Sequence, residues 1–129
     1  MNGDYLLDTN IVIALFAEEQ LVLDKVSQAN SVFIPTIVIG ELYYGAYNSS
    51  KTEENETQID AFATASNTLD CEIFTAKFYG QIKKQLKDKG RPIPENDIWI
   101  AALAMQYDLT LVSRDAHFGF IAGLKWEKW

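Results

Sequence analysis

The chain has 129 residues, of which 48% are hydrophobic and 22% are charged. This size and composition are typical of a single globular domain, which we expect to span residues 1–129. The net charge of -7 argues against binding nucleic acid through the overall field of the protein. No apolar run approaches the roughly 20 residues of a membrane helix, and no basic segment precedes an apolar core near the first residue. We therefore expect neither a membrane span nor a signal peptide.

Cysteine usage gives an expectation about the compartment. Cys71 is the single cysteine, so no disulfide can form within the chain. This fits a reducing cytoplasm, where we expect the protein to act. Because Leu69 and Ile73 lie on either side of it, we interpret Cys71 as a thiol packed in the core.

Short apolar segments alternate along the chain with longer segments in which apolar residues recur at helical spacing. In chain order the pattern predicts a strand at 5–7, helices at 10–16 and 19–28, a strand at 31–34, helices at 37–47 and 52–68, a strand at 71–74, helices at 76–89 and 94–107, and strands at 109–112 and 124–126. Asn10, Thr36 and Thr75 are suitable N-caps for three of these helices. This order predicts an α/β domain with a mostly parallel, twisted central sheet of four or five strands and helices on both faces.

Four acidic residues lie within or beside apolar runs: Asp8, Glu41, Asp97 and Asp115. An ionised carboxylate buried in such a run is destabilising unless another group compensates its charge. The chain has 18 acidic and 11 basic residues, and few of the basic residues lie near these four. A bound divalent cation is the simplest compensation, because converging carboxylates are how proteins hold Mg²⁺ or Mn²⁺. The pattern therefore predicts metal-assisted phosphoryl chemistry.

The predicted fold can bring these acids together. Ligands of parallel sheets bind beyond the carboxyl ends of the strands. Asp8 and Asp115 lie just past predicted strands, and Glu41 and Asp97 lie on predicted helices that can reach the same edge. Taken singly, each acid also has an ordinary explanation, such as a turn residue or an acid in the first turn of a helix.

Four stretches around these acids resemble the motifs of PIN domains, and most closely those of the VapC-type toxin ribonucleases of bacterial toxin–antitoxin pairs. The stretches are YLLDTN at 5–10, IGELYYG at 39–45, PIPENDIWIAA at 92–102 and LTLVSRD at 109–115. Each is a weak motif alone, but together they follow the order and spacing of the family. The resemblance covers the whole chain and implies a PIN-like nuclease domain.

The resemblance also implies roles for individual residues. It implies that Mg²⁺, or Mn²⁺ as a substitute, is bound by Asp8, Glu41, Asp97 and Asp115. Supporting polar groups would be Thr9, Asn10 and Ser113, which orient the carboxylates or a metal-bound water. The implied activity is Mg²⁺-dependent endonucleolytic hydrolysis of RNA by a metal-activated water.

The implied partners are an RNA substrate, a cognate antitoxin protein and a second copy of the chain in a homodimer. Six of the 11 basic residues lie between Lys77 and Arg91. Candidate RNA contacts in this segment are Lys83, Lys84, Lys87 and Arg91, although such a cluster is also typical of a solvated helix face. Core or interface positions are expected for the aromatic residues Tyr43, Tyr44, Tyr47, Trp99, Trp126 and Trp129.

Other functions stay open or are excluded by particular residues. A non-catalytic PIN-fold interaction module and a PIN nuclease that processes RNA without being a toxin both remain possible alternatives. A receiver domain would need adjacent acids after the first strand, and a haloacid-dehalogenase-like phosphatase would need Asp where Asn10 stands. His117 is the only histidine, which excludes two-histidine RNA cleavage and argues against zinc. We interpret His117 as a loop or near-surface residue.

Overall fold

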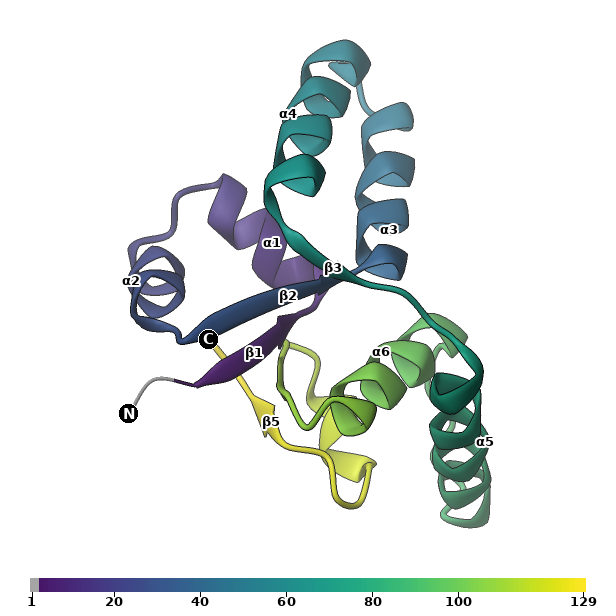
Figure 1. Cartoon of the computed structure of the whole chain (residues 1–129). Helices are drawn as coiled ribbons and strands as arrows, with labels where there is room; N and C mark the ends of the chain where they lie inside the picture. The colour runs from purple at the N-terminus through teal and green to yellow at the C-terminus, as the bar shows by residue number, and fades with distance from the viewer. Residues whose placement is uncertain (1–2) are drawn as a thin grey trace.

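The computed structural model describes residues 3–129. Within them five strands form one sheet in the order β3-β2-β1-β4-β5, and every neighbouring pair is parallel (Figure 1). The strands are β1 (Asp4–Leu7), β2 (Ser31–Pro35), β3 (Asn67–Leu69), β4 (Thr110–Val112) and β5 (Trp126–Glu127). The predicted α/β class with a parallel sheet is confirmed.

Helices connect the strands and lie on both sides of the sheet. They are α1 (Thr9–Phe16), α2 (Gln20–Gln28), α3 (Thr36–Tyr47), α4 (Thr52–Ala65), α5 (Ile73–Asp88), α6 (Glu95–Gln106) and the short 3₁₀ helix η1 (Ala116–Phe120). In Figure 1, α1 to α4 lie above the sheet, and α5 and α6 run side by side below it. No helix in residues 3–129 has both the length and the apolar character needed to cross a membrane.

The central strands explain where the core lies. In a parallel sheet that is covered on both faces, the middle strands are apolar on both sides. Leu6 and Leu7 of β1 and Leu111 and Val112 of β4 are accordingly all fully buried. Polar residues can then appear only where these strands end, and Asp8 and Ser113 are the first residues to do so.

The register of β1 and β4 places these two polar residues side by side. Leu7 lies opposite Val112, and the Asp8 backbone N–H donates to the Val112 carbonyl at 3.0 Å. The chain segments that follow the two strands therefore leave the sheet at the same edge. This is the arrangement that the positions of Asp8 and Asp115 predicted.

The third strand was predicted in the wrong place. The predicted helix at 52–68 ends at Ala65, and β3 is Asn67–Leu69 rather than 71–74. This strand lies at the edge of the sheet, where it needs little apolar character to pair with β2. Residues 71 and 72 instead lie outside any helix or strand, and residues 73 and 74 begin α5. Cys71 is exposed, so its assignment to the core was wrong.

The helix caps also differ from the prediction. Asp8, not Asn10, caps α1, because its carboxylate accepts from the Thr9 backbone N–H at 2.8 Å. Thr36 is the first residue of α3 rather than its cap. Thr75 lies inside α5, where it forms a capping box with Glu72. The cap of α1 matters most, because it leaves the Asn10 side chain free for other contacts.

Candidate active site

Asp8 is the most buried acid of the site. Only 3% of the Asp8 surface is exposed to solvent. One carboxylate oxygen accepts from the Thr9 backbone N–H, and the other accepts from the Ser113 hydroxyl at 2.7 Å. The two donors hold both oxygens in place, so the orientation of Asp8 is fixed by β1, β4 and the first turn of α1.

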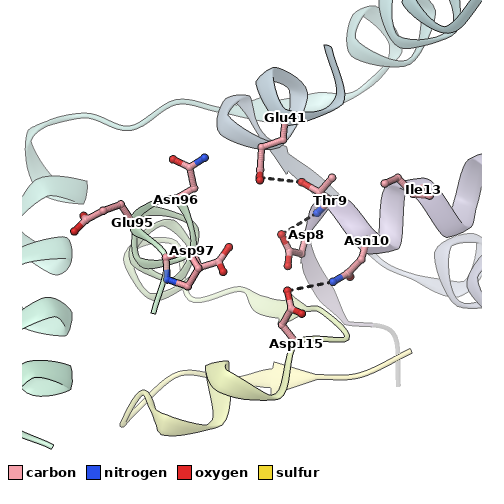
Figure 2. Close-up of a pocket in the computed structure, with 10 residues that line it drawn as sticks. Asp8, Thr9, Asn10, Ile13, Glu41, Glu95, Asn96, Asp97 and Asp115 are labelled. Atoms are coloured by element: carbon pink, nitrogen blue, oxygen red, sulfur yellow. Dashed lines mark hydrogen bonds between the residues drawn. The ribbon is translucent and has the colours of Figure 1, made fainter. Parts of the chain in front are cut away.

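Glu41 reaches the same space from α3. Its Oε1 accepts from the Thr9 hydroxyl at 2.9 Å. Thr9 thus serves two acids at once, with its backbone N–H donating to Asp8 and its hydroxyl donating to Glu41. Figure 2 shows Glu41 and Asp8 on either side of Thr9.

Asn10 ties the end of β4 to the start of α1. Its Oδ1 accepts from the Arg114 backbone N–H at 3.2 Å, and its Nδ2 lies 3.4 Å from both Ser113 Oγ and Asp115 Oδ2. Asp115 itself is exposed. Its carboxylate is therefore positioned by one long hydrogen bond, which is much looser than the support of Asp8.

Asp97 lies in the first turn of α6, opposite the end of the sheet. In Figure 2 its carboxyl group points toward Asp8 and Asp115. The four acids line one cavity of about 500 Å³. The lining residues are Asp8, Thr9, Asn10, Ile13, Glu41, Pro94, Glu95, Asn96, Asp97 and Asp115. The structure thus brings together every predicted site acid and two of the three supporting residues, with Ser113 buried just behind them.

The crowding of carboxylates shifts their protonation. Burial raises the pKa of Asp8, although the hydrogen bonds from Ser113 and Thr9 oppose the shift. Burial also raises the pKa of Glu41, against the hydrogen bond from Thr9. Burial and then the charge of Asp8 raise the pKa of Asp97 to about 6. Unfavourable ionisation of several acids at one place is typical of a functional site.

The residues present fit a hard divalent cation. Five carboxylates, a hydroxyl and two side-chain amides line the cavity, and no lysine, arginine or histidine is among its lining residues. Oxygen donors of this kind suit Mg²⁺ and Mn²⁺. The buried charge of Asp8 is met by two hydrogen-bond donors and, more weakly, by the nearby imidazole of His117, and it is what such an ion would compensate.

His117 is the residue that sequence reasoning missed. It lies in η1, its side chain is 28% exposed, and its Nε2 is 2.9 Å from Asp97 Oδ2. Ligand atoms of Asp97, Asp115 and His117 all lie within 4.8 Å of one another. The spacing of two residues from Asp115 was the only signal in the sequence, and a loop after a strand does not reveal where a side chain will point.

The predicted RNA-contacting residues lie on and after α5, away from the acids' own elements. Lys83, Lys84 and Lys87 are exposed while Ile82 and Leu86 are buried, as predicted for this helix. Lys83 forms an ion pair with Glu95 at 2.5 Å, and Lys84 pairs with Asp88 at 2.8 Å. Glu95 also lines the acidic cavity, so Lys83 connects this basic face to the rim of the site.

Comparison with known proteins identifies the family. The PIN domain family matches residues 5–124. The chain is 38% identical over 128 residues to the ribonuclease VapC2 of Haemophilus influenzae, with 97% of each chain covered. It is 30% identical over 128 residues to the tRNA(fMet)-specific endonuclease VapC of Shigella flexneri, again with 97% of each covered. The crystal structure of VapBC2 from Rickettsia felis bound to a promoter DNA fragment contains a similar chain, with a TM-score of 0.88, 32% identity, and coverage of 97% and 98%. The chain therefore belongs to the PIN domain family, among its VapC proteins.

Proposed function

We propose that this protein is a divalent-cation-dependent endoribonuclease and the toxin of a type II toxin–antitoxin pair. The observation that carries the proposal is the convergence of Asp8, Glu41, Asp97 and Asp115 on one cavity without a lining basic residue. The VapC relatives are named as a ribonuclease and a tRNA(fMet)-specific endonuclease, which supports RNA as the substrate class.

In this proposal the four acids hold Mg²⁺, for which Mn²⁺ can substitute. The bound cation would supply a nucleophilic water near neutral pH and would offset charge on the phosphate. Ser113 and the Thr9 backbone keep Asp8 oriented and favour its ionised form, because both donate to its carboxylate. Thr9 aligns Glu41, and Asn10 aligns Asp115. Without a cation the same acids repel an RNA backbone, so productive RNA binding at this site requires the ion.

The antitoxin would bind beside the acids. A second cavity of about 230 Å³ shares Thr9, Ile13 and Glu41 with the acidic one, and it continues along apolar side chains of α1, α3 and α4. A segment that combines apolar side chains with an arginine or lysine would fill this cavity and neutralise the carboxylates. The similar chains of known structure that occur in VapBC complexes support such a partner.

Self-association and location complete the proposal. Tyr44 and Tyr47 of α3 are 73% and 60% exposed, so both are available for a homodimer or antitoxin interface. Trp129, in contrast, is buried in the core, and Trp99 stacks on Tyr79. A protein that cleaves cellular RNA meets its substrate in the cytoplasm.

The test is cleavage of total cellular RNA by the purified, untagged protein with Mg²⁺, with Mn²⁺ and with EDTA. We expect discrete products that require a cation and are absent with Asp8→Asn and Asp97→Asn. The matched control is Glu54→Gln, which neutralises an exposed acid of α4 and should cleave like the wild type. Equal products from wild type and both site variants would overturn the proposal and favour a non-catalytic interaction module. Analytical ultracentrifugation of the same sample reports the oligomeric state.

A further inference from the structure

We propose that His117 is a nitrogen ligand of the cation in the acidic site, and that it shifts the preference of the site toward Mn²⁺. This inference rests on the proposed function, because it needs a metal at the acids. It concerns a residue that the four-acid pattern does not include.

The His117 nitrogen is placed like a metal ligand rather than like a hydrogen-bond partner. Nε2 is buried, and among the described residues it makes no hydrogen bond. It nevertheless lies 2.9 Å from Asp97 Oδ2. A buried polar atom without a partner is costly and needs an explanation. A shared ion explains it, because both atoms then face the ion instead of each other.

The spacing of the donor atoms also fits neighbouring ligands of one ion. Two neighbouring ligands of an octahedral ion, each at about 2.1 Å from it, lie about 3 Å apart. The separation of His117 Nε2 and Asp97 Oδ2 is 2.9 Å. Asp97, Asp115 and His117 each offer a ligand atom within 4.8 Å of those of the other two. Three ligands of one ion can reach their places from this spacing after a small adjustment.

The chemistry of the histidine nitrogen distinguishes between the two candidate ions. Imidazole nitrogen is a poor ligand for Mg²⁺, which prefers oxygen, but it is a good ligand for first-row transition ions. A site with carboxylates alone would bind Mg²⁺ and Mn²⁺ through similar contacts. Adding one nitrogen therefore favours Mn²⁺ over Mg²⁺, and His117 becomes a determinant of metal choice.

The competing explanation is that His117 only pairs with Asp97. An imidazolium ion beside Asp97 would compensate its charge in the metal-free protein, and bound metal would then displace the ring. The two explanations predict different surroundings for the bound ion. Only the ligand role puts a histidine nitrogen in direct contact with it.

The experiment is pulsed electron paramagnetic resonance of Mn²⁺ bound to the full chain. Because His117 is the only histidine, any imidazole coupling to Mn²⁺ must come from it, provided that the protein carries no histidine tag. We expect a ¹⁴N coupling in the wild type, its replacement by ¹⁵N coupling in protein grown with ¹⁵N-histidine, and its loss in His117→Leu. Asn96→Ser, which removes another nitrogen-bearing side chain of the cavity, should retain the histidine coupling.

Metal titrations give a second readout. We expect His117→Leu to weaken Mn²⁺ affinity at least about tenfold, the lower end of what loss of a metal-orienting partner costs, and to change Mg²⁺ affinity much less. Bound Mn²⁺ without histidine coupling would overturn this inference and leave the proposed function intact. Failure of the wild type to bind Mn²⁺ or Mg²⁺ at all would overturn both. A lower melting temperature of His117→Leu with unchanged Mn²⁺ affinity would assign the residue a structural role only and also overturn the inference.

Discussion

Asp8 and Asp115 both lie beyond the carboxyl ends of neighbouring strands but differ in how firmly they are held. Each follows one of two neighbouring parallel strands, β1 and β4. Asp8 is buried and accepts from two donors, whereas Asp115 is exposed and has one contact of 3.4 Å to Asn10. The end of a strand thus determines where an acid lies, and the surrounding hydrogen-bond donors determine how firmly its carboxylate is oriented.

The difference has a physical cause. Asp8 comes directly after β1 and caps α1, so the backbone on both sides of it is regular and fixed. Asp115 comes three residues after Val112 and precedes the short helix η1, with few donors nearby. We expect Asp8 to set the geometry of the site and Asp115 to adjust to whatever is bound.

The largest expected effect is that of Asp8→Asn. Loss of this charge should reduce RNA cleavage by about 10²–10³-fold, the usual cost of removing one preorganised electrostatic group. Asn still caps a helix well, so circular dichroism should show an intact fold. Glu54→Gln serves as the control for loss of one negative charge. Cleavage within a few-fold of the wild type would contradict the central role of Asp8.

Ser113→Ala should have the next largest effect. It removes the buried hydroxyl that donates to Asp8 at 2.7 Å, and loss of such an orienting partner costs about 10–100-fold in metal affinity. Isothermal titration with Mn²⁺ measures this change. Ser27→Ala is a matched control, because the Ser27 hydroxyl contacts only the Asp24 carbonyl on the exposed α2. Equal affinities of the Ser113 variant and the wild type would mean that the strand end alone positions Asp8.

The pH dependence of stability tests the crowding of the acids. The folded-state pKa of Asp97 is raised from 3.8 to about 6, so the folded protein binds this proton more tightly than the unfolded chain. The resulting stabilisation is complete below about pH 4 and is lost as the pH rises through about 6. In denaturant unfolding of the metal-free protein, the free energy of unfolding should fall by on the order of 2 kcal/mol across this pH range.

Asp97→Asn should remove most of that fall, and Mn²⁺ should restore the stability of the wild type at pH 7.5. Asp8 and Glu41 contribute in the same direction, because burial raises the pKa of each. The same pH dependence of the free energy of unfolding in the wild type and in Asp97→Asn, without metal, would show that Asp97 is not electrostatically strained.

Asp115→Asn should have a smaller effect than Asp8→Asn. Asn retains an oxygen ligand, and the exposed site lets water replace what is lost, so we expect about tenfold slower cleavage or less. Comparing single-turnover rates of the two variants measures the contrast directly. Asp108→Asn, at another exposed acid, is the control. Equal losses in the Asp8 and Asp115 variants would remove the distinction between a fixed and an adjustable acid.

The smallest expected effect belongs to the basic face of α5. Charge reversal of Lys84 and Lys87 should weaken RNA binding a few-fold and make the salt dependence shallower, by about 0.7 per lost phosphate contact with single strands. Lys25→Glu with Lys51→Glu is the control pair of equal charge change. Adding Lys83→Glu should increase the loss, because it also breaks the ion pair with Glu95 at the rim of the site. Equal binding by both double variants would leave α5 as a solvated face.

How much the sequence could predict follows from the range of the forces involved. The buried strands β1 and β4 and the acid that each leads to were predictable, because apolar runs and parallel topology determine them. The edge strand β3 was not, since its pairing depends on β2 rather than on its own composition. Cys71 was misplaced because an apolar segment of four residues can also form an irregular connection and the start of a helix.

Side-chain contacts within the site were the least predictable part. The cavity around the four acids agrees with the sequence pattern, but their metal-binding role stays a prediction. The approach of His117 to Asp97 joins η1 to α6 across 20 positions, and no local pattern encodes it. The cap of α1 depended on whether Asp8 or Asn10 turned toward the helix, a choice that tertiary contacts with Ser113 and Arg114 decide.

The crowding of carboxylates in the site has a consequence for the mutations that selection would favour. Neutralising Asp97 removes repulsion from the fold and chemistry from the site in one step, so the inactive protein is the more stable one. Cells that express this gene without a neutralising partner should therefore accumulate acid-to-amide substitutions that fold well and reach high abundance. Such substitutions abolish activity without misfolding the protein. Sequencing the surviving clones would therefore show which acids are needed for activity.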